Sequence, residues 1–156
     1  MRSVLALIFF VCFAFVAFAQ VSDTRQQELD ELTTRIDKIE ASIDDNKAND
    51  TALVKLRVDL ESFSKSLIEF GISLRPRLGE INQRLDELGV PPKEGEPEEP
   101  AVLAQERVSL QQEKALNNSF IATAESLSVR ASKAIDRIGA LRRELFTNTL
   151  FQRTDI

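Results

Sequence analysis

The sequence predicts an all-α fold, an elongated antiparallel three-helix coiled-coil bundle that thins to a two-helix arm and follows a signal-peptide helix. Three observations predict this fold. Apolar residues recur every three or four positions through three long segments. A polar stretch at 44–50 and a stretch rich in proline and glutamate at 89–100 separate these segments. The last segment, 101–147, has no proline and a single glycine, Gly139.

The segment 101–147 is the longest predicted helix. At about 1.5 Å per residue it extends about 70 Å, more than twice the width of a small domain. The preceding segments must therefore fold back along it. Its expected buried stripe consists of Leu116, Phe120, Ala124, Leu127, Ala131, Ala134, Ile138, Leu141 and Leu145.

The first helix is predicted over about 23–44. Ser22, Asp23 and Thr24 offer side-chain oxygens that can cap its N-terminus. Its apolar residues keep an unbroken three-four spacing, which is the seam of a coiled coil. They are Leu29, Leu32, Ile36, Ile39 and Ile43.

The second helix is predicted over about 51–88, with Thr51 as its N-cap and Gly89 as its C-cap. Pro76 removes one helical hydrogen bond at a cost of about 3 kcal/mol, so we expect a kink near 71–76. The seam resumes directly afterwards, which favours one bent helix over two separate helices. The seam consists of Leu53, Leu56, Leu60, Phe63, Leu67, Phe70, Leu74, Leu78, Ile81, Leu85 and Leu88.

The polar stretch 44–50 predicts a turn between the first two helices. A calcium-binding loop is the alternative, but its ligand pattern is broken. Ala48 stands at a ligand position, Asn49 replaces the required glycine, and Lys55 replaces the terminal glutamate. We therefore interpret this stretch as structural.

Residues 89–100 predict a hairpin tip, because four prolines prevent a helix from continuing through them. The tip is acidic, and its glutamates favour the N-terminus of the helix that follows. The functional alternative is an acidic docking tip for a basic partner. The charged residues are Glu94, Glu96, Glu98 and Glu99 against Lys93.

The lengths of the segments predict the register of the bundle. Antiparallel pairing across the tip places residue 76 opposite about 113 and residue 51 opposite about 138. The first helix then reaches back only to about Leu74. We expect a three-helix section of residues 23–74 and 114–145, and a two-helix arm of residues 76–113, where apolar residues are sparse.

The two ends of the chain differ from the bundle, which is predicted over 20–150. Residues 1–19 predict an export signal, with Arg2, an uncharged apolar run, and a cleavage site at Ala17-Phe18-Ala19. An uncleaved anchor is the alternative. Cys12, the only cysteine, lies in this segment. Residues 148–156, next to an apolar pair of phenylalanines, predict a truncated connection to further sequence.

Composition argues against enzyme chemistry. From Gln20 onward the chain has no Cys, His, Trp or Tyr, which removes nucleophilic triads and zinc sites. Its glycines match no phosphate-binding loop, and nothing desolvates its many carboxylates. We predict no enzyme activity, no cofactor, and no catalytic, cofactor-binding or metal-ligating residue. A net charge of -5 argues against binding nucleic acid.

The end of the third helix is basic, in contrast to the tip. Cations near a helix C-terminus stabilise its dipole, which is the simpler explanation. The alternative is contact with anionic lipid headgroups. Six basic residues outnumber Asp136 and Glu144 in this region: Arg130, Lys133, Arg137, Arg142, Arg143 and Arg153.

A family resemblance rests on Leu74-Arg75-Pro76-Arg77-Leu78, on Leu88-Gly89 followed by Pro91-Pro92, and on two later stretches, Arg142 to Phe146 and Leu150 to Arg153. Over about residues 74–153, the chain resembles the uncharacterised periplasmic domain of large bacterial channels of the small-conductance mechanosensitive type. The resemblance implies an export signal, this helical domain in the periplasm, and a membrane-embedded pore that this sequence lacks. It implies no catalytic or ligand-binding residue.

We therefore expect a non-catalytic periplasmic spacer, sensor or assembly module of such a channel. Its expected partner is the membrane part of a channel or another envelope protein, and association with further copies of the chain stays open. The alternative from another class is a free-standing periplasmic coiled-coil adaptor or chaperone-like protein that holds partners with its arm.

Overall fold

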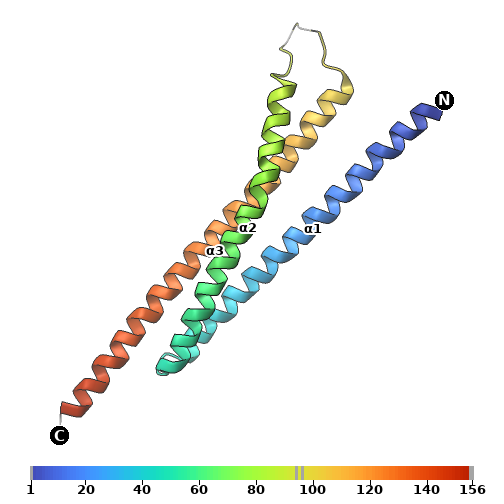
Figure 1. Cartoon of the computed structure of the whole chain (residues 1–156). Coiled ribbons are helices and arrows are strands. Elements are labelled where there is room, and N and C mark those ends of the chain that lie inside the picture. The colour runs from blue at the N-terminus through green and yellow to red at the C-terminus, as the bar shows by residue number, and fades with distance from the viewer. Residues whose placement is uncertain (1, 94, 96, 155–156) are drawn as a thin grey trace.

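The computed structural model describes the backbone of residues 2–93, 95 and 97–154, and the side chains of residues 23–93, 95 and 97–151. This part of the chain contains three helices and no strand: α1 Arg2–Asp45, α2 Asp50–Leu88 and α3 Ala101–Thr154. Figure 1 shows α2 and α3 as an antiparallel hairpin, with α1 beside its lower part and the two chain ends at opposite ends of the rod. The predicted all-α bundle is confirmed.

The hydrophobic core lies where the three helices run together. All five predicted seam residues of α1 are buried, as are seven of the eleven predicted in α2 and six of the nine predicted in α3. Burial of such a continuous apolar stripe is the main source of stability for a helical bundle. The core consists of Leu29, Leu32, Ile36, Ile39, Ile43, Leu53, Leu60, Phe63, Leu67, Phe70, Leu74, Phe120, Ala124, Leu127, Ala131, Ala134 and Ile138.

The three-helix section ends where the register predicts. The Nη1 atom of Arg25 on α1 donates to Ser73 Oγ on α2 at 2.9 Å, one residue before Leu74. Beyond this level α1 separates from the hairpin, and α2 and α3 continue as the arm (Figure 1). Ile81 is fully buried in the arm. The two-helix arm is thus confirmed.

The ends of α2 differ in part from the prediction. Asn49, not Thr51, is the N-cap, because its side-chain oxygen accepts from the Ala52 N–H at 3.1 Å. Thr51 lies inside the first turn. Gly89 is the C-cap as predicted, with a φ of 67° that favours glycine. α2 also continues through Pro76, so the prediction of one helix rather than two is confirmed.

The outer helices are longer than predicted. α1 begins at Arg2, so Ser22 to Thr24 lie within it and do not start it. No proline or glycine interrupts residues 2–45, which allows one continuous helix. α3 continues to Thr154, so residues 148–154 are helical. The side chains of the predicted export signal lie outside the described part, and so does residue 1 entirely.

Candidate functional site

Three arginines of α3 form an interhelical ladder with the C-terminal part of α1 and the first residue of α2. Arg130 donates to Asp37 at 2.7 Å and to Glu40 at 2.6 Å. Seven residues further along α3, Arg137 pairs with Asp44. Five residues after that, Arg142 donates to Asp50 at 2.6 Å. These pairs are partly exposed, so each adds little stability, but together they fix the register of α3 against α1. They are defined here as the ladder: Arg130, Arg137, Arg142, Asp37, Glu40, Asp44 and Asp50.

The ladder lowers the pKa values of two carboxyl groups, those of Asp44 and Asp50. Hydrogen bonds from Arg137 and Lys47 lower the pKa of Asp44 to about 2. A hydrogen bond from Arg142 lowers the pKa of Asp50 below its ordinary value. Asp44 and Asp50 therefore keep their negative charge to a lower pH than an unpaired aspartate does. A permanently ionised, exposed carboxylate is suited to an ion pair and unsuited to proton transfer.

The ladder changes the interpretation of the basic end of α3. Three of its six predicted cations are used in pairs within the chain. Within residues 23–93, 95 and 97–151, Lys133 and Arg143 make no ion pair, and the side chain of Arg153 lies outside this range. Ion pairs within the chain therefore account for three of the six cations, which the sequence alone explained by the helix dipole or by contact with lipid.

The turn after α1 is held by the same polar residues that suggested a calcium loop. Asp44 binds Lys47 at 2.7 Å as well as Arg137, and Asn49 caps α2. Asp50 is paired with Arg142. Among the described residues, no group of three Cys, His, Asp or Glu side chains is arranged to hold a metal ion.

Two interhelical ion pairs join α2 and α3 in the arm. Arg77 donates to both oxygens of Glu113, at 2.6 and 2.8 Å. Arg84 donates to both oxygens of Glu106, at 2.6 and 3.0 Å. Such two-pronged pairs fix the geometry of both partners. The pairing of 77 with 113 confirms the register predicted from the hairpin.

The tip is closed by a buried arginine that sequence reasoning missed. Arg107 is only 7% exposed. It donates to the carbonyl oxygens of Gly89 at 2.6 Å and Leu88 at 3.1 Å, and to Glu99 at 2.7 Å. It thereby satisfies carbonyls at the end of α2, where the helix dipole is negative, and binds the tip loop to α3. We name Arg107, Leu88, Gly89 and Glu99 the tip clamp.

The tip clamp alters the interpretation of the acidic tip. Glu99, one of its four predicted glutamates, serves the clamp and is not free for a basic partner. Glu98 is exposed. Glu94 and Glu96 lie outside the described residues. The sequence gives no signal for Arg107, because apolar residues are sparse between 104 and 115 and its burial depends on where α2 passes across α3.

A second missed residue, Asn117, marks the junction of arm and bundle. It is 6% exposed, and its Nδ2 donates to the Glu113 carbonyl at 2.9 Å. Arg107, Glu113 and Asn117 are the buried polar residues of the described chain, and all belong to α3. A buried amide in a coiled-coil interface favours one register over its neighbours, at some cost in stability.

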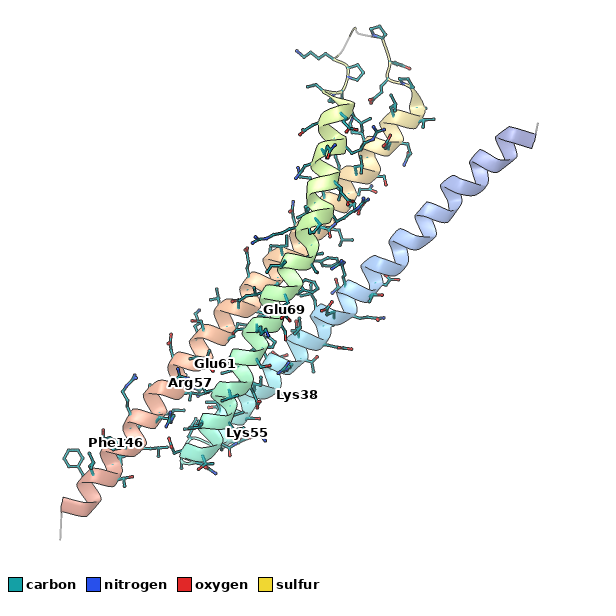
Figure 2. All side chains as sticks on the ribbon, in the orientation of Figure 1. Lys38, Lys55, Arg57, Glu61, Glu69 and Phe146 are labelled. Atoms are coloured by element: carbon teal, nitrogen blue, oxygen red, sulfur yellow. The ribbon has the colours of Figure 1, made fainter. Side chains whose placement is uncertain are left out.

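The far end of α3 carries exposed apolar side chains. Beyond the turn between α1 and α2, α3 extends alone (Figure 1). Phe146 and Phe151 are 66% and 67% exposed, and Leu150 is 48% exposed. An open groove beside them is lined by Arg142, Arg143 and Leu145 from α3 and by Asp50 and Arg57 from α2. Figure 2 shows Phe146 pointing away from the bundle near this end.

Within residues 23–93, 95 and 97–151, no helix has a stretch long and apolar enough to cross a membrane. The described grooves are shallow and lie between charged side chains, as along Asp37, Glu40 and Arg130.

Comparison with known proteins gives one family. The profile of a family described as "Protein of unknown function (DUF3772)" matches residues 121–155. The match covers the basic and apolar end of α3, including Arg142 to Phe146 and Leu150 to Arg153, and does not reach Leu74 to Leu78. It is therefore a similarity of this segment to an uncharacterised helical family. No curated protein and no solved structure matches the chain.

Proposed function

We propose that this chain is a non-catalytic helical domain on the outer side of the inner membrane, and that it spaces and assembles the membrane part of a channel of the small-conductance mechanosensitive type. The observation that carries the proposal is the end of α3. It extends beyond the bundle with Phe146, Leu150 and Phe151 exposed, and it lies within the segment similar to the uncharacterised family.

The construction of the rod supports a spacing role. A three-helix core, the ladder and the tip clamp hold the helices in one register along their length. The buried polar groups serve that register, and the described grooves are open. Lys133 and Arg143, which make no ion pair within residues 23–93, 95 and 97–151, would meet anionic lipid headgroups if this end of α3 lies at the membrane surface. The export signal would place the domain in the periplasm.

Crosslinking in cells tests the proposal. A photo-reactive residue at position 146, in the protein expressed from its own gene, is expected to give adducts with a membrane-embedded channel segment. The same residue at Val102, at the other end of the rod, is the matched control and should give none. Deletion of the gene should also reduce survival of a rapid drop in osmolarity. Unchanged survival together with no membrane adduct from position 146 would refute the channel assignment.

The adaptor alternative is supported by the tip. Val90 and Val102 are 83% and 78% exposed on either side of it. Deletion of residues 89–100 would be a poor test, since it removes Gly89 and Glu99 from the tip clamp. The double variant Val90→Ser with Val102→Ser leaves the clamp intact. It should abolish capture of a partner if the arm is an adaptor, and unchanged capture would exclude this use of the tip.

A further inference from the structure

The outer face of α2 carries a second seam that the bundle does not use. Its six residues are spaced four, three, four, three and four apart, which is the spacing of a coiled-coil interface. All six are exposed, and the four aliphatic ones are between 39% and 60% exposed. We define these residues as the outer seam: Val54, Val58, Glu61, Lys65, Ile68 and Ile72.

The outer seam is not a random scatter of surface residues. It contains every large aliphatic side chain of α2 among the exposed large hydrophobic residues. In an ordinary bundle helix, the face turned away from the core is polar. Here that face is aliphatic at both ends and charged in the middle, which is the pattern expected of a face with a partner.

The outer seam is also self-complementary when its direction is reversed. Its members lie in pairs placed symmetrically about Phe63: Val54 with Ile72, Val58 with Ile68, and Glu61 with Lys65. Each aliphatic residue thus has an aliphatic counterpart. The one acidic residue has the one basic residue as its counterpart.

We propose that the occupant of the outer seam is a second copy of this chain. The two α2 helices lie antiparallel, and the two-fold axis passes through the outer seam at the level of residue 63, on the opposite face of α2 from the buried Phe63 side chain. A two-fold interface requires a surface that complements itself, and the pairs above provide it. Val58 packs on Ile68 of the partner subunit, and Glu61 meets Lys65 of the partner subunit. Symmetry repeats each contact, so the seam forms four aliphatic layers around two ion pairs.

Charge excludes the parallel arrangement. Two parallel, in-register α2 helices would place Glu61 on Glu61 and Lys65 on Lys65, which is repulsive. In the antiparallel arrangement, like flanks of the two seams come together. Lys55 and Glu69 each follow a seam residue on the same flank, so Lys55 of one copy faces Glu69 of the partner subunit.

Present partners of the charged seam residues do not prevent this docking. Glu61 accepts from Arg57 at 3.1 Å and Lys65 lies 3.7 Å from Glu69, both within α2. These are exposed pairs four residues apart, which contribute little and exchange easily. Glu61 and Lys65 are therefore available to the partner subunit. The antiparallel dimer points the α3 ends of its two copies in opposite directions, so the two ends cannot reach the same membrane surface. The dimer therefore fits the free-standing alternative, and its detection would count against the channel assignment.

Sedimentation equilibrium of the full chain, in one mild nonionic detergent throughout, tests the proposal. A seam of this size predicts a dimer with a Kd of roughly 1–100 µM. Glu61→Lys sets like charges against each other twice per dimer, and so does Lys65→Glu. Each should weaken association at least about tenfold. An equimolar mixture of the two variants should restore a dimer, since every charged layer then pairs Lys with Glu.

Glu87→Lys is the matched control. It makes the same charge change on α2 and breaks an exposed pair with Arg84, but it lies in the arm, away from the seam. It should dimerise as the natural chain does, and circular dichroism should show the same helix content in all variants. A monomeric natural chain at about 100 µM, full dimerisation of the single variants, or a mixture that stays monomeric would each overturn the proposal.

Discussion

Removal of the Arg107 guanidinium is the sharpest test of how the arm is built. Arg107→Met keeps most of the buried apolar stem and deletes the hydrogen bonds to Gly89, Leu88 and Glu99. The Arg107 and Glu99 side chains are 9% and 15% exposed, so the pair is largely shielded from water. Breaking a buried pair costs about 3–5 kcal/mol, because one charge stays behind without a partner.

The lower end of that range applies here, because water can reach the freed carbonyls once the tip loosens. We expect the free energy of opening the tip to fall by about 3 kcal/mol, which is roughly a 100-fold faster exchange of its amide hydrogens. The reporters are the N–H groups of Leu103 and Ala104, which donate to the Pro100 carbonyl, and that of Gly89, which donates to Asp86.

Hydrogen exchange followed by mass spectrometry measures this effect, with Arg84→Met as the control. Arg84 makes a two-pronged pair with Glu106, but its side chain is 44% exposed, so its loss should cost under about 1 kcal/mol. Exchange in the three-helix core should be unchanged in both variants. Equal, small effects of Arg107→Met and Arg84→Met at the tip would refute the tip clamp.

Three further predictions follow from the bundle. Phe63→Ala, in the fully buried centre of the core, should lower the free energy of unfolding by about 3–5 kcal/mol in urea titrations, whereas Val58→Ala should change it by under about 0.5 kcal/mol in monomer. Pro76→Ala should raise the melting temperature. The restored hydrogen bond and the removal of the ring clash are together worth up to about 3 kcal/mol, less about 1 kcal/mol for the freer unfolded chain. A lower melting temperature would contradict this. The folded-state pKa of Asp44 is about 2, below its ordinary 3.8, so its contribution is present above about pH 4 and is lost as the pH falls toward 2. Asp44→Asn should flatten this part of the curve of stability against pH. If the variant lost as much stability between about pH 4 and 2 as the natural chain does, the ladder would be refuted.

Local spacing in the sequence determined the helices and their inner faces. A three-four repeat of apolar residues has the same meaning wherever it occurs, because the helix itself turns at nearly that period. The five seam residues of α1 were therefore all identified. Segment lengths then determined the register, as the pairing of Arg77 with Glu113 shows, since an antiparallel hairpin leaves no freedom once its tip is known.

Only the tertiary structure decided which polar residues meet. Arg107 and Asn117 are ordinary polar residues in the sequence, and their burial depends on where α2 passes across α3. The basic end of α3 similarly acquires its partners from α1, about ninety residues away in the chain. The outer seam shows the same limit: its spacing is visible in the sequence, but its exposure depends on the other two helices occupying the opposite side of α2. Charge pairing and burial depend on the distance between helices, which a local pattern does not contain.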